Sequence, residues 1–192
     1  METLDLKNMI TVYSEATPNP ETMKFVLNRL LLPNDTADFP DVDSASDSPL
    51  ASELFNTFDY VRGVFVMNNF VTVTKSEATD WYDIIPTMKE FIKTYVEQDK
   101  PIINARTPGL SDDEDDEVVK KIKELLDTHV KPAVEMDGGA ITFKSFDQGV
   151  VTLSLKGSCS GCPSSTVTLK AGIEGLLKRM VPEVSEVIAD AD

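Results

Sequence analysis

Cysteine is scarce in this chain, whose 192 residues include only Cys159 and Cys162. Two cysteines separated by just two residues cannot supply the long-range disulfides that hold small secreted domains together. Histidine is scarcer still, with His129 as its one instance. The sequence therefore excludes a disulfide scaffold and leaves the cysteine pair for another purpose.

Long apolar runs are also missing. No stretch approaches the roughly 20 apolar residues that a membrane-spanning helix requires, so no membrane role is expected. Residues 1–10 are amphipathic and partly acidic. They lack the basic and apolar regions of a secretory signal and the arginine richness of a mitochondrial one. From these absences the sequence predicts a cytoplasmic protein.

Basic side chains are heavily outnumbered, because the chain has 33 acidic and 18 basic residues and a net charge of -15. Such a chain repels the phosphate backbone, so nucleic acid is not expected as a partner. The charge is uneven. Residues 1–116 carry 22 acidic and 9 basic side chains, a net charge of -13, whereas residues 117–192 carry 11 and 9, a net charge of -2.

What is present fits a folded protein with two small cores. Hydrophobic residues make up 41% of the chain and charged residues 27%, which is ordinary for a globular protein. Within residues 108–117, a Pro-Gly pair is followed by a run of like charges that repel one another. We therefore expect a first domain at 1–107, an acidic linker at 108–116 and a second domain at 117–192.

The first domain mixes strand and helix patterns. Its expected elements are strands at 9–15 and 24–27, a helix at 50–58, a hairpin made by 61–67 and 70–75, and a helix at 80–97. The hairpin turn falls on Asn68 and Asn69, residues that accept a positive φ. Pro86 should perturb the first turns of the second helix.

The second domain has the order helix, strand, strand, helix, strand. The expected bounds are a helix at 118–130 that Lys131-Pro132 ends, strands at 141–146 and 150–155, a helix at 164–180 and a strand at 184–188. Five residues of the second helix should face the core: Val167, Leu169, Ile173, Leu176 and Leu177. The predicted fold class is α+β, with two small domains that each resemble an α/β sandwich.

The candidate reactive or metal-binding residues lie in the run 157–163, Gly-Ser-Cys-Ser-Gly-Cys-Pro, between a predicted strand and a predicted helix. A helix N-terminus lowers the pKa of nearby thiols and favours thiolate, the species that binds metal or attacks disulfides. Four interpretations are open: ligands of an iron-sulfur cluster, a redox-active dithiol, half of a zinc site, or two buried structural cysteines. A zinc site needs two further ligands, and His129, at the end of the preceding helix, is expected to be solvated.

Residues 116–187 resemble the NifU C-terminal (Nfu-type) domain. The resemblance rests on Met136-Asp137-Gly138-Gly139, on the run from Gly157 to Ser165, on Leu169 to Glu174 and on Val181 to Val184. The first domain resembles the Nfu N-terminal domain through Thr17 to Phe25, Ser48 to Ala51 and Val64 to Lys75. Together these motifs span nearly the whole chain.

The resemblance implies a non-enzymatic scaffold or carrier. It implies that Cys159 and Cys162 bind a four-iron, four-sulfur (4Fe-4S) cluster shared between two subunits of a homodimer, because such clusters take about four ligands. Upstream cluster-assembly proteins and apo iron-sulfur recipient proteins are the expected partners. The cysteine-rich domains of full-length NifU are absent from this sequence, which favours carriage over assembly. The expected alternative activity is that of a dithiol oxidoreductase.

Overall fold

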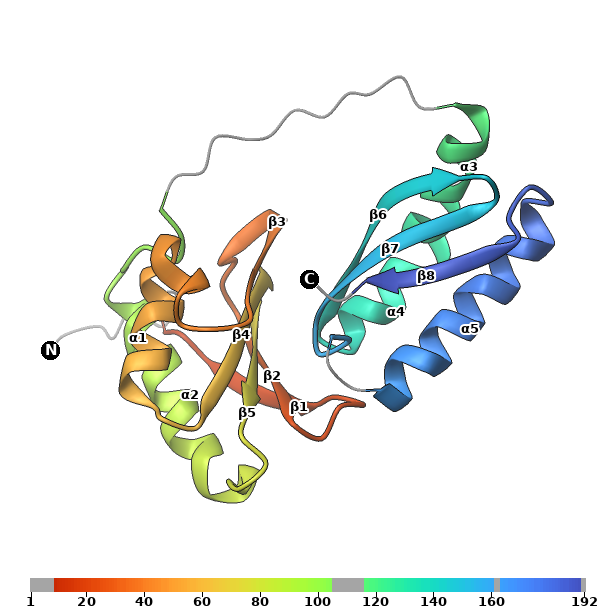
Figure 1. Cartoon of the computed structure of the whole chain (residues 1–192). Coiled ribbons are helices and arrows are strands. Elements are labelled where there is room, and N and C mark those ends of the chain that lie inside the picture. The colour runs from red at the N-terminus through yellow and green to blue at the C-terminus, as the bar shows by residue number, and fades with distance from the viewer. Residues whose placement is uncertain (1–8, 105–115, 161–162, 191–192) are drawn as a thin grey trace, which may run out of the picture. The chain divides into compact units, whose positions relative to one another are not determined.

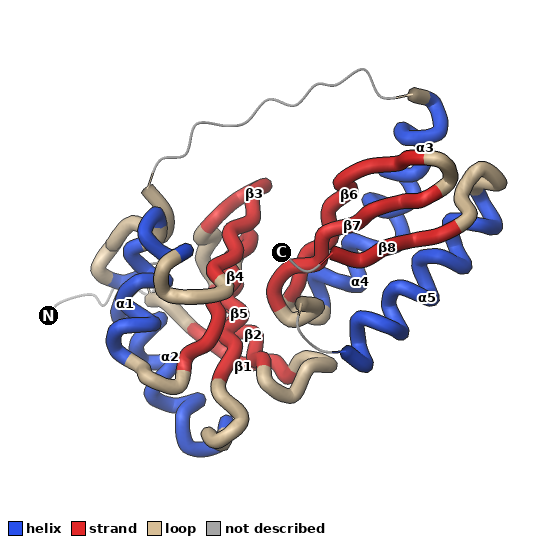
Figure 2. Tube along the Cα trace, viewed as in Figure 1, coloured by secondary structure: helices blue, strands red, loops and turns tan. Residues whose placement is uncertain are grey.

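The computed structural model describes residues 9–104, 116–160 and 163–190, which form two compact units, each with its own sheet (Figure 1). Helices and strands occur in both units (Figure 2). The α+β fold class is thus confirmed. Across these described ranges, no helix combines the length and apolarity needed to cross a membrane.

The N-terminal unit is a five-stranded antiparallel sheet covered by two helices. Its strands lie in the order β1-β2-β5-β4-β3. The bounds are β1 Val12–Ala16, β2 Thr22–Leu27, β3 Leu32–Phe39, β4 Val61–Asn68 and β5 Phe70–Lys75, with helices α1 Pro49–Thr57 and α2 Trp81–Glu97. The β4–β5 hairpin turns at Asn68, whose φ of 46° is the positive value that asparagine tolerates.

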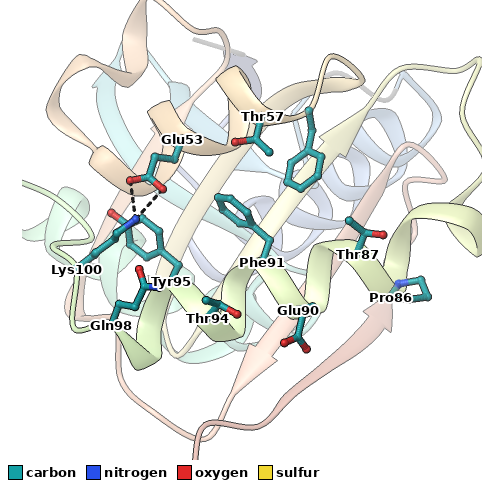
Figure 3. A pocket seen from close by; sticks show the side chains of 11 residues that line it. Glu53, Thr57, Pro86, Thr87, Glu90, Phe91, Thr94, Tyr95, Gln98 and Lys100 are labelled. Carbon is teal, nitrogen blue, oxygen red and sulfur yellow. Dashed lines mark hydrogen bonds and ion pairs between the residues drawn. The ribbon is translucent and has the colours of Figure 1, made fainter.

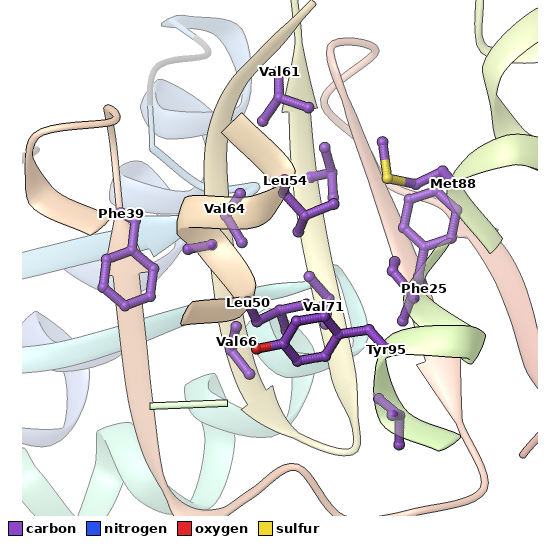
Figure 4. Packing of buried hydrophobic residues seen from close by; sticks show 14 of the residues in the cluster. Phe25, Phe39, Leu50, Leu54, Val61, Val64, Val66, Val71, Met88 and Tyr95 are labelled. Carbon is purple, nitrogen blue, oxygen red and sulfur yellow. The ribbon is translucent and has the colours of Figure 1, made fainter. Parts of the chain in front are cut away.

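The core of this unit lies between the helices and one face of the sheet (Figure 4). Phe25 from β2 and Phe39 from β3 are fully buried there, together with Leu54 from α1 and Met88 from α2. Helix α2 continues through Pro86, contrary to our expectation of a disturbed start. Pro86 is exposed, so the helix loses one backbone hydrogen bond at a solvated position and no core contact.

Strand β3 was not expected from the sequence. It contains Pro33, Asn34 and Asp35, three residues that are depleted in strands. The strand lies at the edge of the sheet and pairs only with β4, with a register irregularity between Leu32 and Thr36. Edge positions tolerate proline because one side of the strand needs no ladder hydrogen bond.

The C-terminal unit has the predicted order of helix, strand, strand, helix, strand. Its elements are α3 Glu117–Leu125, a π-helical turn Leu126–Val130, α4 Lys131–Met136, β6 Gly139–Asp147, β7 Val150–Gly157, α5 Pro163–Met180 and β8 Glu186–Asp190. Strand β7 is central, antiparallel to β6 and parallel to β8. The helices contribute Ile122, Val134 and Leu177 to one core against this sheet.

Two details of this unit correct the sequence analysis. Lys131-Pro132 does not end the first helix, because the π-helical turn precedes α4 and Pro132 falls in its first turn, where a missing N–H costs nothing. In α5, Ile173 and Leu177 are buried and Leu169 and Leu176 partly so, but Val167 is 66% exposed. Residues 108–115 of the expected linker at 108–116 lie outside the described residues, so the domain bounds remain a prediction.

Candidate functional site

The cysteine loop begins where β7 ends. Gly157 closes the strand with a φ of 65°, which turns the chain toward Ser158, Cys159 and Ser160 before α5 begins at Pro163. The strand–loop–helix setting of Cys159 is therefore as expected. Cys162 lies outside the described residues, as do the side chains of Ser164, Ser165 and Thr166.

Ser158 fastens the loop to the turn before β6. Its hydroxyl donates to the carbonyl oxygen of Asp137 at 2.5 Å, and its amide donates to the carbonyl oxygen of Gly138 at 3.3 Å. Gly138 has a φ of 82°, which glycine adopts without strain. Ser158 is 2% exposed. Ser158 therefore holds the cysteine loop against the Asp137–Gly138 turn.

Cys159 lies in the core of the C-terminal unit and is 7% exposed. Burial raises the pKa of its thiol, the hydrogen bond with Ser158 acts in the opposite direction, and the charge of Asp137 raises the pKa further. The expected lowering of this pKa by the helix N-terminus is therefore wrong for the unloaded protein. Burial is the largest cause of the raised pKa, because a charge is disfavoured once it leaves water.

Few other groups could complete a metal site. Within 9–104, 116–160 and 163–190, no three histidine, cysteine, aspartate or glutamate side chains converge as metal ligands. His129 is exposed on the π-helical turn, as expected for a solvated side chain. One chain therefore offers two thiols in one loop.

A groove of about 700 Å³ lies between α1 and α2 in the N-terminal unit (Figure 3). Phe91 lies edge-on to Phe58 with ring centroids 5.2 Å apart. At one end Lys100 forms an ion pair with Glu53 at 3.1 Å and lies over the ring of Tyr95. No cysteine or histidine lines the groove, so it offers a surface for contacts and no thiolate chemistry. Sequence reasoning missed it, because it forms only when two separate helices pack side by side.

Two family models match the chain. "Scaffold protein Nfu/NifU N terminal" covers residues 12–99, and "NifU-like domain" covers residues 122–188. A solved structure titled "NifU-like protein" from Saccharomyces cerevisiae is 18% identical, with a TM-score of 0.47 over 55% of this chain and 94% of that one.

Curated relatives extend over both units. The "NFU1 iron-sulfur cluster scaffold homolog, mitochondrial" of Drosophila willistoni is 44% identical over 94% of this chain and 64% of its own length. The human protein of the same name is 42% identical over 92% of this chain and 70% of its own length. The chain thus spans about two thirds of the length of these relatives.

The predicted cytoplasmic location is wrong, since the relatives are named as mitochondrial and point to mitochondria. The prediction rested on features missing from residues 1–10. A folded acidic domain has the same core, charge and loop chemistry in either compartment, so composition carried no positive signal for the cytoplasm.

Proposed function

Because the chain belongs to the Nfu family of scaffold proteins, we propose that it binds an iron-sulfur cluster as cargo and passes it to apo-proteins without catalysing a reaction of its own. The cluster would come from upstream cluster-assembly proteins and leave for apo iron-sulfur recipient proteins. The observation that carries the proposal is the CxxC loop between β7 and α5, fastened to the Asp137–Gly138 turn by Ser158.

Cys159 and Cys162 are the proposed ligands, and the proposed cargo is a 4Fe-4S cluster. Such a cluster takes about four protein ligands, and one chain has two cysteines. Two chains would therefore share one cluster, with a loop from each. Each thiol must lose its proton to bind iron. Release would follow when thiolates of a recipient replace those of the carrier.

A dithiol oxidoreductase is less well supported. The attacking thiol of such an enzyme is accessible and has a lowered pKa. Cys159 is buried, and burial raises the pKa of its thiol. A zinc module is disfavoured too, because the described residues bring no further metal ligands together.

Anaerobic reconstitution of the protein with iron and sulfide tests these alternatives. A carrier should turn brown, with broad visible absorption and iron and sulfide in equal amounts. Reduction of insulin without colour would instead favour the oxidoreductase. Tight stoichiometric zinc that iron does not displace would favour the zinc module.

The N-terminal unit is proposed to recognise partners. It contains no cysteine and so supplies no thiolate ligand, whereas its groove between α1 and α2 presents aromatic surface beside charged groups. Transfer from the full chain to an apo-ferredoxin, compared with transfer from residues 117–192 alone, measures this contribution. Equal transfer rates would contradict partner recognition by the N-terminal unit for that recipient.

A further inference from the structure

We infer that Gly139 is a positioning residue for the sulfur of Cys159. Gly139 is the first residue of β6 and pairs with Gly157, the last residue of β7. A Cβ atom at Gly139 would lie 2.9 Å from Sγ of Cys159 and 2.7 Å from the carbonyl oxygen of Lys156. Real Cβ atoms essentially never approach other heavy atoms within 3.0 Å. The sulfur can occupy its place only because residue 139 has no side chain.

Sterics, and not backbone conformation, require glycine here. Gly138 and Gly157 have φ values of 82° and 65°, which residues with a side chain rarely adopt. Gly139 is not among the glycines with positive φ. Another residue could adopt its backbone angles, and what such a residue would add is contact with the sulfur and with Lys156.

The neighbouring hydrogen bonds hold the sulfur in this place. The hydroxyl of Ser158, 3.9 Å from Sγ of Cys159, is held by the carbonyl oxygen of Asp137. Since the amide of Ser158 is also bonded to Gly138, the loop cannot withdraw from the turn without breaking both bonds. We name this arrangement, with Gly139 and the hydroxyl of Ser158 beside the sulfur, the cysteine seat.

The consequence for cluster binding rests on the proposed function. A thiolate ligates iron along a defined direction, and two loops must present their sulfurs to one cluster. A displaced sulfur would misalign the ligand set even though both cysteines were intact. The cysteine seat would thus fix where the cargo is held.

Gly139→Ala is the direct test, with Gly172→Ala and Gly175→Ala as controls because a Cβ at either position of α5 meets nothing within 4 Å. In apo-protein at one fixed pH, the rate at which iodoacetamide alkylates Cys159 is measured by mass spectrometry of its peptide. Gly139→Ala should raise this rate about tenfold or more, because exposure controls thiol reactivity. It should also lower the iron bound per chain at least by half, while the controls match the parent in both respects.

A double-mutant cycle separates the sulfur contact from the contact with Lys156. Gly139→Ala is made in the parent and in Cys159→Ala, where no sulfur remains. The loss of Tm should be smaller in the Cys159→Ala background. Equal losses in both backgrounds, including loss of folding in both, would overturn the cysteine seat.

The double-mutant cycle and the alkylation need no cluster. The experiments therefore test the proposed function and the positioning role of Gly139 independently. A parent that cannot be reconstituted would overturn the proposed function and leave these apo-protein results standing. A parent and a Gly139→Ala variant that bind equal iron, with equal alkylation of Cys159, would overturn the positioning role alone.

Discussion

At the scale of single residues, the burial of Cys159 opposes the ionisation of its thiol that iron binding requires. Its position among apolar side chains raises the pKa of the thiol, whereas iron requires the thiolate. Burial thus shields this sulfur from solvent and disfavours the charged form that iron requires. Binding of iron must compensate for removal of the proton.

Replacement of either cysteine by serine should abolish stable cluster binding, because a hydroxyl is a poor ligand for iron beside thiolates. Cys162→Ser should leave the circular dichroism unchanged. Cys159→Ser should also fold, with a loss of about 1–2 kcal/mol, since it places a hydroxyl in a buried position. Visible absorption and iron analysis after reconstitution give the readout. Full colour in either variant would contradict the ligand assignment.

Tyr95 should make the N-terminal unit less stable at alkaline pH. Burial raises the pKa of its phenol to about 12, with a further contribution from the charge of Glu53, and the hydroxyl donates to the carbonyl oxygen of Pro101 at 2.8 Å. In the unfolded chain the phenol ionises at about 10. Stability should therefore fall as pH rises from about 10 to about 12, where only the unfolded form loses this proton.

Ultraviolet titration of tyrosine ionisation checks this expectation. The parent should show a tyrosine component with a pKa of about 12 that disappears in Tyr95→Phe. Burial also raises the pKa of Tyr60, whose own component should remain in this variant. The matched control is Tyr82→Phe, because Tyr82 is 85% exposed and its removal should leave the component at about 12 in place. Survival of the component at about 12 in Tyr95→Phe would assign it to another tyrosine.

At the scale of elements, one buried hydroxyl links a helix start to the end of the N-terminal unit. Ser48 caps α1 by accepting a hydrogen bond from the amide of Ala51 at 3.1 Å. The same hydroxyl donates to the carbonyl oxygen of Ile102 at 2.7 Å. Ser48 is fully buried, so water cannot replace either bond if the hydroxyl is removed.

Ser48→Ala should lower the free energy of unfolding of this unit by about 2 kcal/mol, through the lost cap and the unsatisfied carbonyl of Ile102. Urea denaturation followed by circular dichroism measures the change. The control is Ser46→Ala, an exposed position two residues earlier, which should stay within about 0.5 kcal/mol of the parent. Similar midpoints for the two variants would show that the Ser48 hydroxyl stabilises little.

At the scale of the whole molecule, the excess acidic charge and the two cysteines lie in different parts of the sequence. Residues 1–116 carry a net charge of -13, and residues 117–192 contain both cysteines. Each unit has its own hydrophobic core. Each should therefore fold without the other.

Limited proteolysis should cut the chain between about residues 108 and 117, since polar, charged connections between domains are the usual sites of cleavage. Two stable fragments are expected. The C-terminal fragment should still accept a cluster, because both proposed ligands lie within it. Failure of that fragment to bind iron would show that the N-terminal unit contributes ligands or shielding.

Cluster loading should convert monomers to dimers that contain about two irons per chain, because two chains are needed to supply four thiolates. The large apolar side chains exposed in the described part of the C-terminal unit are Met136, Val167, Met180 and Ile188, which come from three elements. We therefore expect iron–sulfur bonds to hold the dimer, and chelation to return monomers. Size-exclusion chromatography with light scattering measures both states. A loaded monomer with four irons and no bound small thiol would contradict sharing.

Sequence by itself determined the elements with strong local signals. The apolar pattern predicted the two strands of the β6–β7 hairpin and the helices α2 and α5. The run around Cys159 and Cys162 marked the candidate site, because cysteine is otherwise absent. These signals are local, so each could be found without knowing the fold.

Only the tertiary structure decided which neighbours these residues have. Strand β3 forms despite its polar sequence because β4 offers an edge to pair with. The π-helical turn lets the helix continue past Pro132. Cys159 is buried because β6, which begins 20 residues earlier in the chain, places Gly139 against its sulfur. Pairing, burial and the resulting pKa depend on residues distant in sequence, and local propensity contains no information about them.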